Sequence, residues 1–545
     1  MSSRRGALFL FLSTSMLTAV SAQSNGIQGM DVQLNRLETI SALGRSGAYP
    51  NGQNGCAMST TSCNVGTVNI PWYAPMQERH PLIAFLAARE SEGRFEQISD
   101  YSFVKHGFLA TNSPGCGTCI SPGTSSLLGV RCTDTYGTGN NGDNYYLGPA
   151  AEIDPWLGTW QARGSHFDRG EPDVGAPLNN DGIRSLTGSM ASALGPVAHR
   201  MVIADQDFLK PNSTFFYQAQ YVIDSEFESV RGDNLGWRRF TAAWSGTRWN
   251  LAMVVAQPMA FGSILDAWSG ATVQSNTNGA DDGRFYVAVK VEGPVNGLYT
   301  YRYAVHNRDN RRGGGALRIP ICADARVANP WFRDVDGNTS NDWTFTRTAN
   351  EIVFTAPTGA ALRWNSFYNF EFVSDAAPVT TNVSIDQADA GAGAAFVSVA
   401  SRAPLGLDNQ FLGDGCGTPT PPTLYAVGMP AKAQLGNATF GVELGNLVPN
   451  AGSALVIASA NGNTPLGGGC TLYMDPLLIA LTLAGTANAS GIQALPLPIP
   501  TNSSLEGASL TLQGIELQTP GAYLGAIDLS NGLKIRIGSN ISNCP

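Results

Sequence analysis

From about residue 200 onward, apolar residues recur at every second position in short segments, separated by turn-forming clusters such as 307–315. A period of two places successive side chains on opposite faces of a strand, and segments bounded by Gly, Asn, Asp and Pro indicate strands joined by tight turns. The chain supplies these turns with 62 Gly and 31 Pro among 545 residues. The fold is therefore predicted to be mainly β, a multidomain set of antiparallel β-sandwiches with a few short helices in the N-terminal region. The predicted strands here are Met201–Ala204, Phe215–Ile223, Phe285–Val291, Leu298–His306, Ala316–Ile321, Trp343–Thr348, Ile352–Thr355 and Phe367–Phe372.

Two segments before residue 100 predict short helices. In 80–89, Pro81 stands near a first turn, good helix formers follow it, and Gly93 comes after them. In 32–43, apolar residues spaced for one side of a helix are Val32, Leu34, Leu37 and Ile40.

The chain opens with a pattern typical of exported proteins. Arg4 and Arg5 precede an apolar stretch, Ala7–Val20, and Val20-Ser21-Ala22 fits signal-peptidase cleavage. The stretch is shorter than the roughly 20 residues of a membrane-spanning helix. We expect a signal peptide over 1–22, cleavage near Ala22, a secreted or cell-surface location, and no transmembrane segment in the mature chain. The most apolar later segment, Leu477–Ala484, is also too short to span.

A chain of 545 residues exceeds the size of one core, about 250–300 residues, and predicts several domains. The Pro-rich stretch 412–422 is typical of a stiff linker. We expect a loop-rich N-terminal region over 23–195, a β-sandwich domain over 196–411, the linker, and a C-terminal β-sandwich module over 423–545. The module's predicted strands are Ala438–Leu444, Ala454–Ala458, Leu477–Leu483, Gly491–Leu497, Ser509–Ile515 and Leu533–Ile537.

Charge and motifs remove several function classes. The net charge is −9 with no run of Lys or Arg, so nucleic acid is not an expected partner. The chain has no G-x-S-x-G elbow, no H-E-x-x-H and no phosphate loop. The chain therefore lacks the usual signatures of serine esterases, zinc proteases and NTPases.

Nine cysteines in an exported chain favour disulfides and leave at least one cysteine unpaired within the chain. The disulfide candidates are Cys56 with Cys63 as a local pair, and Cys416 and Cys470, which with Cys544 could hold the ends of the C-terminal module together.

A second interpretation applies to the cysteines of 104–134. A His, a C-x2-C pair and a third Cys supply the four ligands that a tetrahedral Zn²⁺ or copper site needs. The alternative is that Cys116 or Cys119 is oxidised with Cys132 and that His106 is a hydrogen-bonded structural residue. The metal candidates are His106, Cys116, Cys119 and Cys132.

Carboxylates and aromatic residues alternate between 134 and 173. A glycosidase needs two carboxyl groups across one bond, and aromatic rings stack on sugars, so this segment permits a polysaccharide hydrolase or a glycan-binding site. Solvated loops over a core are the alternative. The catalytic candidates are Asp134, Glu152, Asp154 and Asp168, and the aromatic ones are Tyr136, Tyr145, Tyr146, Trp156 and Trp160.

A third candidate site resembles the front half of a calcium loop, in which oxygen ligands alternate around a Gly. The Glu that closes such a loop at position 12 is missing, and an Asx-rich turn is the alternative. The candidate Ca²⁺ ligands are Asp334, Asp336, Asn338 and Asp342.

Several motifs resemble uncharacterised secreted proteins of planctomycete-type bacteria. In the C-terminal module these motifs are Gly469–Tyr473, Ala494–Pro500 and Leu529–Gly538, and in the larger part they are Val104–Phe108, Leu128–Asp134 and Leu362–Phe370. The resemblance implies an extracytoplasmic, modular, β-rich protein and supplies no catalytic residues. The function expected first is a noncatalytic secreted or cell-surface protein that binds glycans or cell-surface components, or acts in the envelope or in adhesion. A polysaccharide hydrolase and a metal-binding or redox protein are the alternatives.

Overall fold

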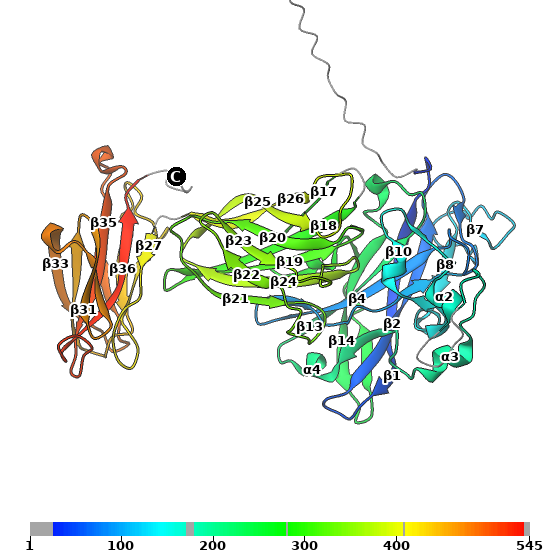
Figure 1. The fold of residues 1–545 in the computed structure, drawn as a ribbon, viewed down its shortest axis with the longest axis horizontal. Helices are drawn as coiled ribbons and strands as arrows, with labels where there is room; N and C mark the ends of the chain where they lie inside the picture. The colour runs from blue at the N-terminus through cyan, green and yellow to red at the C-terminus, as the bar shows by residue number, and fades with distance from the viewer. Residues whose placement is uncertain (1–25, 171–178, 279–281, 407–408, 539–545) are drawn as a thin grey trace, which may run out of the picture.

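The computed structural model describes residues 26–170, 179–278, 282–406 and 409–538. The predicted signal peptide and its cleavage site lie outside these residues. The chain forms antiparallel sheets with a few short helices, which confirms the predicted fold class. Three sandwiches follow one another along the long axis of the molecule (Figure 1). None of the helices in the described ranges is both long and apolar enough to cross a membrane.

The N-terminal sandwich, 26–270, packs a four-stranded sheet on an eight-stranded one. The smaller sheet holds β1 (Val32–Ser46), β2 (Gln53–Asn64), β8 (Thr133–Tyr136) and β12 (Met201–Ala204). The larger sheet runs in the order β15 (Trp249–Met253), β14 (Leu235–Trp244), β13 (Thr214–Val222), β4 (Leu82–Ser91), β6 (Val104–His106) and β9 (Leu147–Gly148), with β5 (Arg94–Gln97) on β4 and β16 (Ala260–Phe261) on β14. A single apolar core lies between the two sheets.

The helix predicted at 80–89 is wrong, because this segment is strand β4. Residues 82–89 are all buried, and β4 pairs with β13 from Leu82 with Val222 to Glu90 with Thr214. A strand that is covered on both faces has a continuous run of apolar residues in its sequence. Periodicity does not distinguish such a run from a buried helix.

The helix predicted at 32–43 is also wrong, because these residues belong to strand β1. Its pairing with β2 shifts register between Leu34 and Arg36 and again between Leu37 and Ile40. Each shift is a β-bulge, which adds one residue and turns a spacing of two into a spacing of three. The buried positions Leu34, Leu37 and Ile40 therefore imitate helical periodicity.

Short helices between 138 and 209 and two small strand pairs cover the side of the N-terminal sandwich. They are α1 (Thr138–Asn141), η1 (Asn144–Tyr146), η2 (Ala150–Glu152), α2 (His166–Arg169), α3 (Gly188–Ala193) and α4 (Asp205–Leu209), with the small pairs β3 (Ile70–Pro71) on β7 (Leu127–Leu128) and β10 (Ile153–Asp154) on β11 (Thr159–Trp160). The expected boundary between 195 and 196 is not a domain boundary, because β4 and β13, from either side of it, pair in one sheet.

The middle sandwich, 272–406, contains two five-stranded sheets around one core. The first runs in the order β17 (Thr272–Thr277), β18 (Arg284–Val295), β19 (Leu298–Asn307), β24 (Ser366–Ser374) and β21 (Val327–Arg333). The second runs in the order β22 (Thr344–Arg347), β23 (Glu351–Thr355), β20 (Gly314–Pro320), β25 (Ala377–Gln387) and β26 (Phe396–Gly406).

The C-terminal module, 409–538, is a smaller sandwich. Its five-stranded sheet runs in the order β27 (Asn409–Leu412), β36 (Ile527–Arg536), β35 (Ser509–Leu517), β30 (Gly452–Ala458) and β33 (Ile479–Thr486). The facing sheet holds β28 (Thr423–Val427), β29 (Gly441–Gly445) and β34 (Gln493–Pro496), and β31 (Asn461–Gly467) and β32 (Cys470–Met474) form a hairpin. The expected linker 412–422 is attached to this module, because β27 pairs with β36 and Cys416 is bonded to Cys470.

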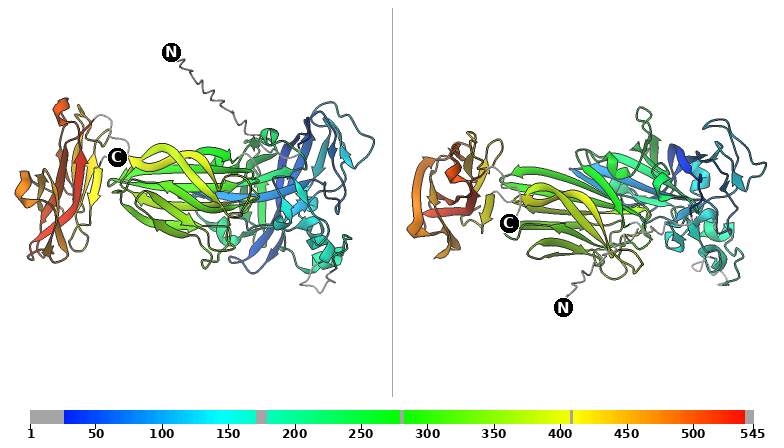
Figure 2. Two further views of the ribbon diagram at one scale, coloured as in Figure 1. Left: turned by 45° about the horizontal axis from the view of Figure 1, so that its top comes forward. Right: turned by 90° about the horizontal axis from the view of Figure 1, so that it is seen from above.

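The N-terminal and middle sandwiches share a buried apolar seam, which includes Phe95 and Phe216 from the first and Phe367 from the second. The 3-10 helix η5 (Ile264–Ala267), which leads from one sandwich to the other, packs into this seam. Two views at different angles show the middle sandwich lying between its neighbours (Figure 2).

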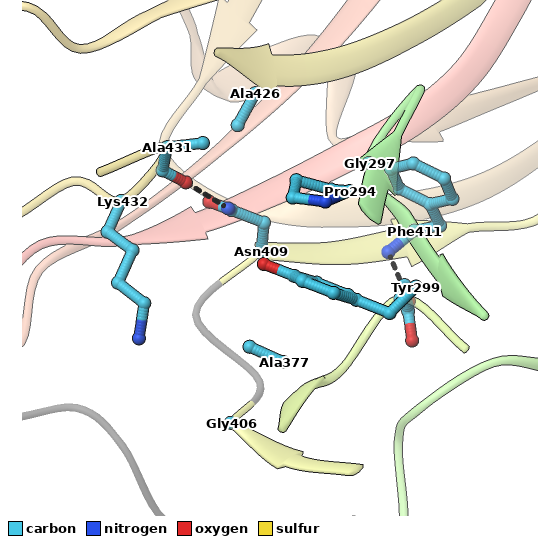
Figure 3. A pocket seen from close by; sticks show the side chains of 11 residues that line it. Pro294, Gly297, Tyr299, Ala377, Gly406, Asn409, Phe411, Ala426, Ala431 and Lys432 are labelled. Carbon is cyan, nitrogen blue, oxygen red and sulfur yellow. Dashed lines mark hydrogen bonds between the residues drawn. The ribbon is translucent and has the colours of Figure 1, made fainter. Parts of the chain in front are cut away.

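A small pocket of about 20 Å³ lies where the C-terminal module meets the middle sandwich (Figure 3). The backbone N–H of Phe411 donates to Asp375 (3.0 Å), and the side chain of Asn409 donates to the carbonyl of Ala431 (2.8 Å). A space of this size holds about one water molecule, so it is part of the joint and not a ligand site.

Candidate functional site

The cysteines proposed as metal ligands form disulfides instead. Cys63 is bonded to Cys116, and Cys119 is bonded to Cys132. Their sulfurs are oxidised, so no thiolate remains there for Zn²⁺ or copper, which contradicts the proposed ligand set. Such bonds persist in oxidising compartments and indicate an extracytoplasmic location.

The predicted Cys56–Cys63 pair is also wrong, since Cys56 is a buried free thiol. Both residues lie on strand β2. Seven residues of extended chain span roughly 23 Å, far beyond the Cα separation of about 6 Å that a disulfide allows. Cys322 is disulfide-bonded as well.

His106 is part of a buried aromatic cluster. Its Nδ1 lies 2.6 Å from Nε2 of His80, and Trp160 donates its indole N–H to Nδ1 of His80 (3.0 Å). Burial lowers the pKa of His80 to about 3 and also lowers that of His106. Both rings are therefore neutral, and His106 is a hydrogen-bonded structural residue.

Two of the four catalytic candidates are buried acceptors. Asp134 accepts from the backbone N–H of Thr111 (2.8 Å) and from the indole of Trp72 (3.0 Å). Asp168 accepts from the backbone N–H groups of Gly164 (2.7 Å) and Gly182 (3.1 Å). These hydrogen bonds show that both carboxylates stabilise the local backbone.

The other two candidates also have structural partners. Glu152 accepts from the backbone of His166 (2.8 Å), and burial raises its pKa. Asp154 forms an ion pair with Arg311 (2.8 Å) that joins the N-terminal and middle sandwiches. None of the four lines the clefts described below. The proposed aromatic platforms Tyr136, Trp156 and Trp160 are buried, so their faces are not available to a sugar.

The candidate calcium loop connects β21 to β22. Its side chains form successive Asx turns: Asp334 accepts from the backbone of Asp336 (3.0 Å), and Asp336 accepts from that of Asn338 (2.6 Å). Burial and the nearby Asp336 and Asp342 raise the pKa of Asp334 to about 6. Within the described ranges no three acidic, His or Cys side chains are gathered as metal ligands. Calcium binding therefore stays a prediction.

The structure reveals another site, an open cleft of about 400 Å³ beside the seam between the N-terminal and middle sandwiches. Its floor is one face of the larger N-terminal sheet. The register places Glu90 of β4 opposite Thr214 of β13, and Phe216 of β13 opposite Arg239 of β14. Trp237 lies two residues before Arg239, and the period of two puts it on the same face.

Two loop segments complete the cleft. Gln257 and Pro258 follow β15, and Ala267 and Ser269 lie at and after the end of η5. The Trp237 indole is half-buried and meets Phe216 edge to face, with ring centroids 5.9 Å apart. Volumes of roughly 300–1,000 Å³ at domain junctions are typical of ligand sites.

Hydrogen-bond donors in the cleft lack protein partners. The indole Nε1 of Trp237 and the Nε of Arg239 are buried and have no hydrogen-bond acceptor within the described part of the chain. Burial raises the pKa of Glu90, while Lys290 and Arg239 act in the opposite direction. The cleft thus combines an aromatic ring with one carboxylate, one unpaired guanidinium and small hydroxyl and amide groups.

A second open cleft, of about 410 Å³, lies against the 73–79 segment, but its two arginines already have partners. Arg79 forms an ion pair with Asp224, and Arg163 donates to the backbone carbonyls of Asn180 and Asp181. The Trp237 cleft, whose donors are unpaired, is therefore the better candidate.

Sequence reasoning missed the Trp237 cleft. Its residues come from three strands and two loops between positions 90 and 269, and no short motif connects them. The only local signal is the pair Trp237 and Arg239, an aromatic and a cationic residue two positions apart in a strand.

Comparisons with known proteins give only distant likenesses. The chain matches no family model and no curated protein. BcpA, the major pilin subunit of Bacillus cereus, is 10% identical over 61% of this chain and 94% of its own, with a TM-score of 0.17. A tetra-tandem repeat from the extending region of a large adhesion protein is 9% identical over 89% of this chain and 96% of its own, with a TM-score of 0.14. These scores are too low to transfer a fold or a function.

Proposed function

We propose that this protein is a noncatalytic extracytoplasmic binding protein that holds a saccharide in the Trp237 cleft. The observation that carries the proposal is the half-buried indole of Trp237 beside donors without protein partners. Sugar rings present apolar C–H faces and a rim of hydroxyl groups. An aromatic face with polar groups around it matches both features.

Binding is favoured over hydrolysis by the same lining. Glu90 is the single carboxylate among the residues that line the cleft. Glycoside hydrolysis ordinarily requires two carboxyl groups that flank the bond, as acid and as base or nucleophile. The cleft supplies one, so it recognises a saccharide and does not cleave it.

Replacement of Trp237 by Ala is expected to weaken saccharide binding about tenfold or more, because an aromatic residue at the centre of a site typically contributes about 2 kcal/mol. A glycan array on the mature protein identifies the saccharide, and calorimetry on the best hit measures the loss.

The matched control is Trp244→Ala. Trp244 lies on the same strand, β14, but packs against the opposite side of the sheet. The Trp244→Ala substitution should leave saccharide binding unchanged. Equal binding by Trp237→Ala and the native protein, or release of shortened sugars by the native protein, would contradict the proposal.

We further propose that the protein is exported as a modular protein of the planctomycete-type group that its motifs resemble. The expected N-terminus of the secreted form is Gln23, since cleavage is predicted after Ala22. N-terminal sequencing of protein recovered from outside the cytoplasm tests this. A retained Met1 on the accumulated protein would be the opposite result.

A further inference from the structure

The C-terminal module ends in an open sheet edge. Strand β33 is the last strand of the five-stranded sheet, and it pairs only with β30. Its other edge has no strand partner among the described residues. In Figure 1 it lies at the end of the molecule farthest from the N-terminal sandwich, where the other sandwiches leave it accessible.

This edge is unusually apolar. Leu477 is 90% exposed and Leu481 is 48% exposed. Leu481 pairs with Ile457, whose side chain lies in the module core, so Leu481 points toward the interior of the sandwich although it is half open to solvent. The reason is that the facing sheet has only three strands and does not cover the edge of the five-stranded sheet.

The edge also lacks charge. Residues 476–505 contain no Asp, Glu, Lys, Arg or His. Proteins ordinarily protect exposed edge strands with charged side chains, especially Lys, or with Pro, and none of these occurs within β33. Two copies of a chain with net charge −9 repel one another in general, but here no charges oppose contact.

We propose that β33 is an assembly surface through which two copies of this protein pair edge to edge, antiparallel, around a two-fold axis. An axis at Thr482 places Leu481 beside Leu483 of the second copy on the core-facing side. It places Thr482 beside Thr482 on the outer side. Apolar pairs and Thr pairs are favourable across strands, and the free backbone N–H and C=O groups gain partners.

The test is the mass of the mature full-length protein by sedimentation velocity between 1 and 100 μM. The native protein is expected to form a dimer as concentration rises. Thr482→Lys is expected to weaken the dimer at least tenfold, because two like charges then face each other at the axis. Circular dichroism and melting temperature verify that this exposed substitution leaves the fold intact.

The matched control is Thr344→Lys, the same change on β22, an exposed edge of the middle sandwich. The Thr344→Lys variant should form the dimer to the same extent as the native protein. A native protein that stays monomeric throughout the range overturns the proposal, as does a Thr482→Lys variant with unchanged dimerisation. The saccharide proposal is independent, since Thr482→Lys leaves the Trp237 cleft untouched.

Discussion

Replacement of Asp309 by Asn is expected to lower the free energy of unfolding by about 3–5 kcal/mol, since it leaves the buried Arg231 without its carboxylate partner and Arg308 with Glu228 alone. Asp309 is only 1% exposed. Its carboxylate accepts from Arg308 (2.9 Å) and from Arg231 (3.2 Å), and both arginines are buried. Burial opposes ionisation of Asp309, but the two guanidinium groups outweigh it and lower its pKa.

The network has a further role, because it joins two sandwiches. Arg231 belongs to the N-terminal sandwich, whereas Asp309 follows β19 of the middle one. The carboxylate of Asp309 also accepts a hydrogen bond from the backbone N–H of Arg284 (2.8 Å). Asp309→Asn should therefore destabilise the joint between these sandwiches as well as the local turn.

Urea unfolding followed by tryptophan fluorescence measures this loss. The control is Asp386→Asn, which breaks the half-exposed surface pair with Arg318 and should cost less than about 1 kcal/mol. If the two variants were equally stable, the buried network would not hold the joint.

Replacement of Lys105 by Met is expected to raise the free energy of unfolding near pH 7 by about 2–4 kcal/mol, because Met fills the same space without a charge. Lys105 is fully buried, and its Nζ has no hydrogen-bond partner in the described residues. Its ammonium lies over the rings of Tyr146 (4.1 Å) and Phe108 (4.5 Å). These contacts recover only part of the hydration that the charge loses.

The pH dependence gives the sharper signature. Burial lowers the pKa of Lys105 to about 7, whereas the unfolded value is about 10.4. Asp143 opposes this shift and Arg184 adds to it. Between these values the unfolded chain holds a proton that the folded chain has released, so the contribution of Lys105 to the free energy of unfolding rises as pH increases from about 7 to 10. Burial raises the pKa of the Cys56 thiol to about 12, which acts in the opposite direction above about pH 8.5.

Urea unfolding at pH 7, 8, 9 and 10 measures the difference in the free energy of unfolding between Lys105→Met and the native protein, which should shrink as pH rises. The control is Lys210→Met, which removes an exposed lysine paired with Glu92 and should keep the pH dependence of the native protein. A difference between the variant and the native protein that stays constant from pH 7 to 10 would show that the charge is accommodated at no cost.

The strands after residue 200 could be predicted because their information is local. The predicted Met201–Ala204 agrees with β12 residue for residue, and Leu298–His306 agrees with β19 to within one residue. β12 alternates buried and half-buried residues along its length, and β19 alternates them over 300–303, so a two-residue period is present in the sequence of both.

The strands before residue 100 could not be predicted in the same way. The neighbours of β4 cover both its faces, and β1 carries bulges that depend on its pairing with β2. The partner β13 of β4 lies more than 100 residues away in the chain, whereas β2 directly follows β1, and neither the cover of β4 nor the bulges of β1 can be read from periodicity within one segment. The same limit applies to the cysteines, because Cys63 pairs with Cys116, 53 residues away, and not with Cys56 in its own strand.

The sequence by itself determined that this is a β-rich chain with turn-separated strands, nine cysteines and an uncharged apolar segment near 480. Only the tertiary structure decided what these features do. It left β33 at an open edge, placed the proposed cysteine ligands in disulfides and brought Glu90, Trp237 and Arg239 onto one face. Composition and periodicity are properties of neighbouring residues, whereas a site and an open edge depend on which distant strands pair and which remain unpaired.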